Sequence, residues 1–195
     1  MIRVIIASTE WLSFEDARRL PLVTKEDVIK AARFLKESDK TLNIVSAYLK
    51  RKYVGEWRLT KNGKPVAKGV YFNVSHCEGM VAIALAEREV GVDVENVRPI
   101  DQATIDYATS VEEKAFVKTY EDFFKLWTSK ESLVKAEGEG FVLPPKDIPA
   151  LPIEGIKSYK NEVYYSRSTV VDGVALSVAA RRGAFEWEIE KELLK

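Results

Sequence analysis

The two halves of this 195-residue chain repeat one order of sequence patterns. A strand pattern at 2–7 is followed by helical segments and then by the alternating apolar run Met80-Val-Ala-Ile-Ala-Leu-Ala. The second half closes its own series with Gly173-Val-Ala-Leu-Ser-Val-Ala. Strand patterns grouped apart from helical patterns are typical of an α+β fold. The repeat predicts two similar α+β lobes, residues 1–90 and 91–195, that join near residue 90.

Local patterns predict the elements of each lobe. Thr24 caps a helix expected over 25–37, and the capping box Ser110-Val-Glu-Glu113 opens a helical run that ends at Gly138. Segments 81–86 and 90–95 flank a three-residue turn and are typical of a hairpin or of adjacent strands. The remaining expected elements are a helix over 41–53 and strands near 54–59, 70–75, 156–160, 162–170 and 173–181.

The distribution of charge restricts the function. Thirty basic and thirty acidic residues cancel to a formal net charge of zero, which argues against a generally basic nucleic-acid binder and against an acidic disordered chain. Residues 25–68 nevertheless hold 12 basic and 5 acidic residues, whereas residues 69–140 hold 7 and 14. Solvated helices with a chance bias would explain this division, and so would a basic anion site beside an acidic cation site.

Cysteine usage and hydropathy indicate the compartment. The chain has one cysteine, Cys77, and one histidine, His76, which excludes an internal disulfide and a Cys/His zinc cluster. The uncharged stretch from Val4 to Thr9 is too short for a signal peptide, and no apolar run approaches the roughly 18 residues of a membrane span. We expect a cytoplasmic protein with no membrane or nucleic-acid partner.

The stretch Gly91-Val92-Asp93-Val94-Glu95 places two carboxylates side by side. Because side chains alternate along a strand, Asp93 and Glu95 point one way and the two valines point the other way. A divalent cation such as Mg²⁺ would relieve the repulsion between the carboxylates. A strand end with polar residues that face water would give the same pattern.

A helical stretch supplies a third carboxylate. Trp127, Glu131 and Lys135 are spaced four residues apart and share one helical face. Glu131 and Lys135 have the order of an ordinary helix ion pair. If this face opposed Asp93 and Glu95, three carboxylates would converge on one ion, with a lysine one turn away that could contact a phosphate.

Ser75 ends the strand expected near 70–75, and His76 follows it in a segment that we expect to form a turn before the next strand. A hydroxyl, an imidazole and exposed backbone N–H groups can together bind phosphate oxygens, although a lone histidine is more often structural. A serine hydrolase is disfavoured, because adjacent residues on a strand point to opposite faces and no G-x-S-x-G motif is present.

Four motifs taken in order resemble those of the surfactin-synthetase-type 4′-phosphopantetheinyl transferases. They are Gly63-Lys64-Pro65, Phe72-Asn-Val-Ser-His76, Gly91-Val-Asp-Val-Glu95 and Trp127-Thr-Ser-Lys-Glu-Ser-Leu-Val-Lys135. The resemblance covers roughly residues 34–141. It implies a monomer of two α+β lobes related by pseudo-twofold symmetry, with coenzyme A and Mg²⁺, or Mn²⁺ in its place, in the cleft between the lobes.

The resemblance also assigns roles to individual residues. It makes Asp93, Glu95 and Glu131 the metal ligands, and it makes Lys135 a contact of the coenzyme A phosphates that assists the leaving group. The other coenzyme A contacts that it implies are Ser75, His76, Lys64, Pro65 and Lys40, with Lys36 as the alternative to Lys40 for the 3′-phosphate.

One further acidic position is left open by the resemblance. Glu113 matches the acidic residue that the family has ahead of the long helix, with Glu112 as the alternative if the register shifts.

The implied reaction transfers the 4′-phosphopantetheine arm of coenzyme A to a serine of an apo acyl or peptidyl carrier protein and releases 3′,5′-ADP. Glu131, Lys135 and His76 are the expected catalytic residues. Two alternatives remain: a noncatalytic protein that binds coenzyme A or a carrier protein, and a different Mg²⁺-dependent enzyme that acts on nucleotides or phosphodiesters.

Overall fold

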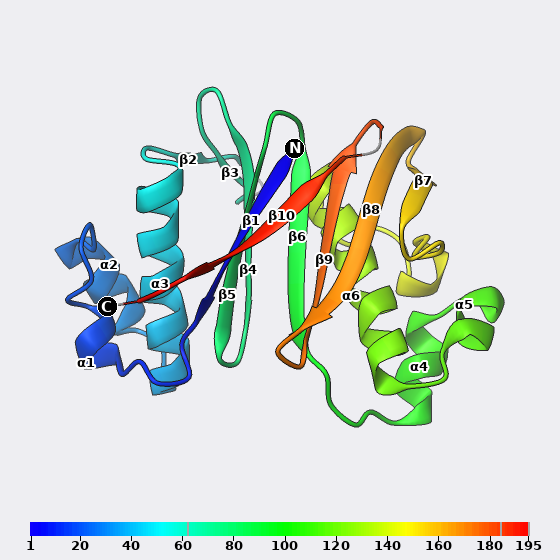
Figure 1. Cartoon of the computed structure of the whole chain (residues 1–195), viewed down its shortest axis with the longest axis horizontal. Helices are drawn as coiled ribbons and strands as arrows, with labels where there is room; N and C mark the ends of the chain where they lie inside the picture. Colours follow the sequence, from blue (N-terminus) through cyan, green and yellow to red (C-terminus); the bar gives the residue numbers. More distant parts are fainter. Residues whose placement is uncertain (62, 184, 195) are drawn as a thin grey trace. The chain divides into compact units, whose positions relative to one another are not determined.

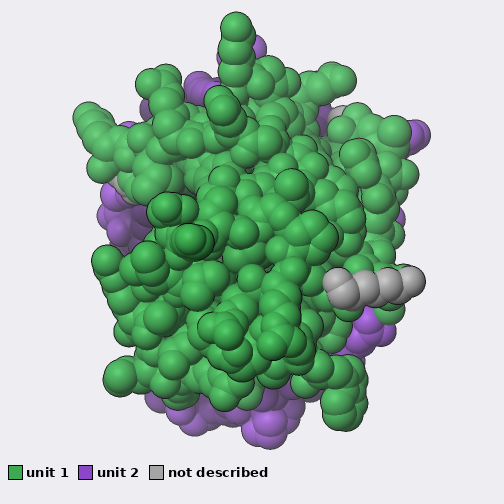
Figure 2. Space-filling view, turned by 90° about the vertical axis from the view of Figure 1, so that its left-hand side faces the viewer, with its two compact units in different colours: residues 1–87, 187–195 green, residues 88–186 purple. Residues whose placement is uncertain are grey.

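The computed structural model describes residues 1–61, 63–183 and 185–194. The chain forms two compact units, coloured separately in Figure 2. The first unit contains Met1–Glu87 together with Trp187–Lys195, and the second contains Arg88–Glu186. The boundary expected at residue 90 lies close to the observed one. The C-terminal segment differs from the expectation, because it belongs to the first unit rather than to the second.

The first unit combines a four-stranded sheet with helices and a short hairpin (Figure 1). Its strands are β1 (Ile2–Ser8), β2 (Arg58–Leu59), β3 (Pro65–Val66), β4 (Tyr71–Cys77), β5 (Met80–Ala86) and β10 (Trp187–Glu192). Its helices are α1 (Phe14–Ala17), α2 (Lys25–Ala31) and α3 (Glu37–Tyr53). The sheet has the order β10-β1-β5-β4, and β2 pairs with β3.

The C-terminal strand β10 completes the first sheet. It pairs in parallel with β1, and its Glu192 accepts hydrogen bonds from Tyr48, Lys52 and Tyr53 of α3. Sequence periodicity did not predict this strand. Its alternation, Trp187-Glu-Ile-Glu-Lys-Glu192, has few apolar residues, because the strand lies at an edge of the sheet and is only partly buried.

Helix α2 is shorter than the expected 25–37. Thr24 caps it as expected and forms a capping box with Asp27. The helix ends at Ala31, its last buried residue, and residues 32–38 are exposed. Because a longer α2 would bury no apolar surface there, it would gain little from tertiary packing. The chain turns instead, and α3 begins four residues earlier than the expected 41–53.

The second unit has a four-stranded antiparallel sheet and a long helix. Its strands are β6 (Val90–Asn96), β7 (Gly155–Tyr159), β8 (Glu162–Val171) and β9 (Val174–Arg181), in the order β6-β9-β8-β7. Its helices are α4 (Gln102–Ala108), α5 (Val111–Phe116) and α6 (Tyr120–Glu137), with a 3₁₀ turn η1 at Pro145–Asp147. Helix α6 packs against β6, β9 and β8 (Figure 1).

The same connectivity occurs in both units. In the first, β1 is followed by α3 and by the β4–β5 hairpin, whose β5 pairs with β1. In the second, β6 is followed by α6 and by the β8–β9 hairpin, whose β9 pairs with β6. The two alternating apolar runs are thus the equivalent interior strands β5 and β9, both almost wholly buried. The predicted α+β class and the repeated order of elements are confirmed.

Strands β5 and β6 do not form the hairpin that their spacing allowed. They are consecutive in sequence but lie in different sheets. Strand β5 is already flanked by β1 and β4, and β6 pairs with β9, so that prediction is wrong.

The helical run after Ser110 is interrupted. The Ser110–Glu113 capping box starts α5 as predicted, but α5 ends at Phe116. A second capping box, between Thr119 and Asp122, then starts α6, and Gly138 ends α6 in the left-handed conformation with φ 97°. Within the part of the chain that the structure describes, no helix is both long enough and apolar enough to cross a membrane.

Candidate active site

A glycine allows β6 and α6 to touch at the backbone. A Cβ atom on Gly91 would lie 2.0 Å from the carbonyl oxygen of Ser132 and 2.4 Å from the backbone nitrogen of Ala136. No side chain fits in that space. Because side chains alternate along β6, Asp93 and Glu95 share the face of Gly91 and therefore lie on the side of α6.

Lys135 of α6 contacts Asp93 of β6. Its ammonium Nζ lies 2.5 Å from Asp93 Oδ1. Asp93 is 3% exposed, whereas the Lys135 side chain is 29% exposed. The expectation that the Glu131/Lys135 face opposes the Asp93/Glu95 face is therefore met at this pair, and Lys135 reaches across to the strand.

The carboxylates of this face share one electrostatic environment. Burial, followed by the charge of Asp93, raises the pKa of Glu131 to about 7; Glu95 adds to this effect and Lys135 opposes it. Burial and the charge of Asp93 also raise the pKa of Glu95, against the effect of Arg98, whose Nη1 lies 3.4 Å from a Glu95 carboxylate oxygen. The charge of Asp93 thus disfavours ionisation of both glutamates.

The carboxylates of Asp93, Glu95 and Glu131 suit a hard divalent cation in their chemistry, although they are not arranged as a complete set of metal ligands. Among the residues that the structure describes, no group of three or more His, Cys, Asp or Glu side chains is arranged to hold a metal ion. Asp93, Glu95 and Glu131 nevertheless offer only carboxylate oxygens, the ligand type that Mg²⁺ prefers. A divalent cation would compensate their mutual repulsion.

The raised pKa of Glu131 predicts a pH-dependent stability. Between about pH 4.5 and about pH 7, the folded metal-free protein binds a proton at Glu131 that the unfolded chain has released. The free energy of unfolding should therefore fall as pH rises through this window, by at most about 3 kcal/mol. Glu131→Gln should remove this component. Urea denaturation with EDTA at about pH 5 and about pH 8 measures it, and an unchanged pH dependence in the variant would contradict the prediction.

A groove lined mainly by aromatic and aliphatic residues lies beside Glu131. It has a volume of about 400 Å³, and Trp127 stacks on Phe141 in its wall with ring centroids 5.9 Å apart. The groove is lined by Tyr107, Trp127, Glu131 and Phe141-Val-Leu-Pro-Pro145. Sequence reasoning missed it. The available signal was the apolar run that follows the glycines at the end of α6, Phe141-Val142-Leu143, whose side chains stay at least 40% exposed.

A buried ion pair lies on another face of α6. Glu113 is 3% exposed and Lys130 is 1% exposed, and the carboxylate accepts a hydrogen bond of 2.6 Å from the ammonium. Burial lowers the pKa of Lys130, and the hydrogen bond to Glu113 opposes this shift. Glu112, the alternative residue, is exposed and accepts from the Ser110 hydroxyl. The signal for Lys130 was a lysine within the apolar stripe of α6, between Leu126 and Leu133.

Ser75 lies within β4, in line with the strand expected near 70–75, and His76 also lies within β4, so the expectation of a turn at His76 is wrong. The β4–β5 hairpin turns only after Cys77, the last residue of β4, which still pairs with Met80 of β5. Ser75 is 7% exposed, whereas His76 is exposed. As neighbours on a strand they point to opposite faces, so a single ligand group would contact the two side chains only at the edge of the sheet.

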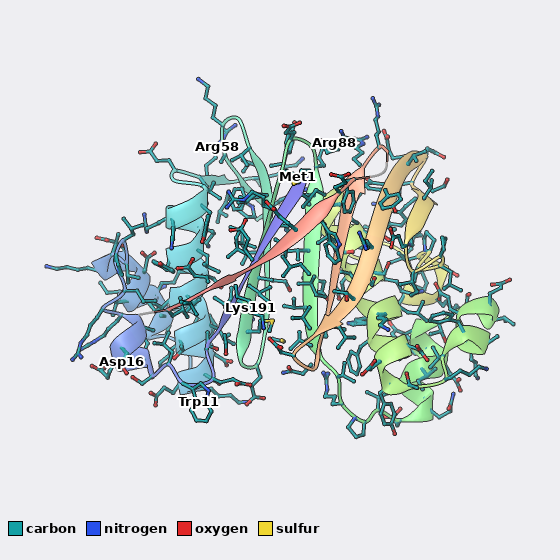
Figure 3. All side chains as sticks on the ribbon, in the orientation of Figure 1. Met1, Trp11, Asp16, Arg58, Arg88 and Lys191 are labelled. Carbon is teal, nitrogen blue, oxygen red and sulfur yellow. The ribbon has the colours of Figure 1, made fainter. Side chains whose placement is uncertain are left out.

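The other expected coenzyme A contacts also belong to the first unit. Lys64 precedes β3, which Pro65 opens opposite Leu59 of β2. Lys40 lies in the first turn of α3, with its Nζ 5.8 Å from the centroid of the Phe14 ring, and Lys36 is the exposed N-cap of the same helix. Arg58 on β2, labelled in Figure 3, is exposed.

Comparison with known proteins identifies the family. Residues 89–178 match the 4′-phosphopantetheinyl transferase superfamily. The chain is 30% identical over 153 residues to the 4′-phosphopantetheinyl transferase ffp of Bacillus subtilis, which covers 68% of each chain. It is also 30% identical over 139 residues to the 4′-phosphopantetheinyl transferase gsp of Aneurinibacillus migulanus, which covers 63% of this chain. The chain therefore belongs to the 4′-phosphopantetheinyl transferase superfamily, which confirms the resemblance drawn from its motifs.

Coverage of some relatives is partial. The chain spans 59% of the length of gsp and 38% of the length of the 4′-phosphopantetheinyl transferase psf-1 of Bacillus pumilus, to which it is 34% identical over 94 residues. The matched superfamily segment, residues 89–178, contains β6, α6 and the groove.

Proposed function

We propose that this protein transfers the 4′-phosphopantetheine arm of coenzyme A to a serine of an apo acyl or peptidyl carrier protein and releases 3′,5′-ADP. The observation that carries the proposal is the backbone contact between β6 and α6 at Gly91, which sets the carboxylates of one element against the carboxylate and ammonium of the other. Membership of the transferase superfamily supports the reaction class.

The metal ligands in this proposal are Asp93, Glu95 and Glu131. A bound Mg²⁺, or Mn²⁺, would neutralise the negative charge that develops on the phosphoryl oxygens. Since Lys135 contacts Asp93, its ammonium lies next to the proposed metal ligands and can also contact a phosphate of coenzyme A.

In this proposal, one residue takes up the proton of the attacking hydroxyl and two others offset the negative charge on the phosphates. The hydroxyl oxygen of the carrier serine forms a bond to the β-phosphorus, and Glu131 accepts the hydroxyl proton directly or through water. The bond from that phosphorus to the bridging oxygen breaks, and 3′,5′-ADP leaves with the electron pair. Lys135 and His76 offset the negative charge on the transferred and departing phosphates.

The first unit supplies the nucleotide contacts in this proposal. Ser75 and His76 of β4 bind phosphate oxygens, Lys64 and Pro65 lie beside the nucleotide, and Lys40 meets the 3′-phosphate. Lys40 is partly exposed on a helix of the basic stretch 25–68, which is consistent with an anionic ligand.

The groove beside Glu131 suits the part of coenzyme A that carries no charge. Its aromatic and aliphatic lining and its volume of about 400 Å³ are typical of a pocket for a small organic molecule. We propose that it holds the pantetheine arm, with the phosphate end at Glu131. The protein would act as a cytoplasmic monomer.

Mass spectrometry tests the reaction. Incubation of the protein with coenzyme A, Mg²⁺ and an apo carrier protein should add the mass of phosphopantetheine to the carrier. A carrier with its acceptor serine replaced by alanine, and a sample with excess EDTA, should show no addition. A noncatalytic binding protein would bind coenzyme A without forming the adduct. The absence of an adduct on each of several carriers would refute the proposed function.

A further inference from the structure

The buried ammonium of Lys130 joins α6 to the loop that follows it. Its Nζ donates to Glu113 Oε2 at 2.6 Å, to the Pro145 carbonyl at 2.8 Å and to the Ile148 carbonyl at 2.8 Å. An ammonium has three protons, so these three acceptors use its full donor capacity. Two of the three belong to the loop, which is therefore fixed to the helix at two successive points.

Glu113 fixes the same loop from the other side. Its Oε1 accepts from the backbone N–H of Ala150 at 2.9 Å, and its Oε2 accepts from the backbone N–H of Ser110 at 2.9 Å. The pair thus joins the start of α5, the middle of α6 and residues 145–150. We call Glu113 and Lys130 the loop clamp.

The clamped loop is continuous with the wall of the groove. Residues 141–145 line the groove, and Pro145 is both a lining residue and an acceptor of the Lys130 ammonium. The wall is held at its other end by the stacking of Phe141 on Trp127. Lys130 directly precedes Glu131 but points away from the groove into the interior, where it is 1% exposed. The clamp therefore reaches the groove only through the loop.

A buried ion pair is weak grounds for stability, because desolvation of two charges offsets much of their attraction. We propose that Glu113 and Lys130 are positioning residues that hold residues 141–145 as the wall of the groove, and that they thereby set the affinity for the pantetheine arm of coenzyme A. This inference rests on the proposed function, since it takes coenzyme A as the ligand. The clamp itself does not touch the substrate.

The double variant Glu113→Gln/Lys130→Met tests the clamp. It removes both charges together, so no buried charge is left without a partner, while the Pro145 and Ile148 carbonyls lose their donor. Calorimetry should show coenzyme A bound about tenfold or more weakly, with 3′,5′-ADP, which lacks the arm, changed less than about twofold. In turnover, KM for coenzyme A should rise much more than kcat falls. Lys160→Met, which removes the ion pairs with Glu137 and Glu139 at the end of α6, is the matched control.

The fluorescence of Trp127 reports on the wall without any ligand. The signal of this residue is obtained as the difference between a protein and the same protein with Trp127→Phe. Release of the wall should make Trp127 more accessible to acrylamide in the double variant and leave it unchanged in Lys160→Met. If the double variant does not fold, Glu113→Asp, which keeps a negative charge beside Lys130 but shortens the side chain that accepts from the Ala150 N–H, is measured in the same way.

The ligand affinities and the quenching of Trp127 distinguish a failure of the clamp proposal from a failure of the proposed function. Equal weakening of coenzyme A and 3′,5′-ADP, or no weakening of either, would overturn the positioning role. If the wild-type protein binds neither compound, the proposed function fails, and unchanged quenching of Trp127 would then reject the clamp independently.

Discussion

Glu131→Gln and Asp93→Asn should each lower turnover by about a hundredfold or more without unfolding the protein. Both changes remove a negative charge from the set that we propose to hold the metal. The fold should tolerate them, because burial and then the charge of Asp93 raise the pKa of Glu131 to about 7, so that loss of either charge relieves repulsion, and an asparagine at position 93 can still accept from Lys135. At neutral pH the glutamine variant should be at least as stable as the wild type in the absence of metal.

The matched control is Glu121→Gln, which changes an exposed carboxylate on the same helix. Turnover is measured as phosphopantetheine transfer over a Mg²⁺ titration, and stability by urea denaturation. Glu121→Gln should retain wild-type turnover. Wild-type rates in Glu131→Gln or Asp93→Asn at limiting Mg²⁺ would contradict the assignment of these residues to the site.

Gly91→Ala should have the second large effect, on both stability and activity. The added Cβ would lie 2.0 Å from the Ser132 carbonyl oxygen and 2.4 Å from the Ala136 nitrogen, and both atoms are backbone. No rotamer change can relieve this contact, so α6 must move away from β6. We expect a loss of about 3 kcal/mol of stability. We also expect roughly a hundredfold loss of turnover, because a displacement near 1 Å misaligns catalytic groups.

Gly173→Ala is the control for Gly91→Ala. Gly173 has φ 76° and no heavy atom within 4 Å of an added Cβ, so alanine there meets backbone strain but no clash. It should cost about 1 kcal/mol and leave turnover nearly unchanged. Thermal denaturation and the transfer assay compare the two variants. A Gly91→Ala protein with wild-type stability would show that the helix and strand are not in backbone contact.

Local interactions explain which parts of the fold could be predicted. The capping boxes at Thr24 and Ser110, the stop at Gly138 and the apolar strands β5 and β9 depend on residues close in sequence. Their physical basis is a hydrogen bond to a free helix N–H, a left-handed glycine or an alternating pattern. Each of these can be recognised within a few positions.

Pairing between distant segments could not be predicted in the same way. Strand β10 joins β1, which lies at the opposite end of the chain, and β5 and β6 enter different sheets although three residues separate them. Such choices depend on which edges of a sheet are already occupied and on burial in the assembled unit. No pattern within β10 or β6 contains that information.

The candidate site shows the same division. The residue types Asp93, Glu95, Glu131 and Lys135, at their spacing, already indicated a metal and phosphate chemistry. Only the tertiary structure decided that Lys135 pairs with Asp93 across two elements and that Gly91 is the point of contact between them. It alone also revealed the groove and the loop clamp, because these arise where residues distant in sequence come into contact, as Trp127 does with Phe141 and Lys130 with Glu113.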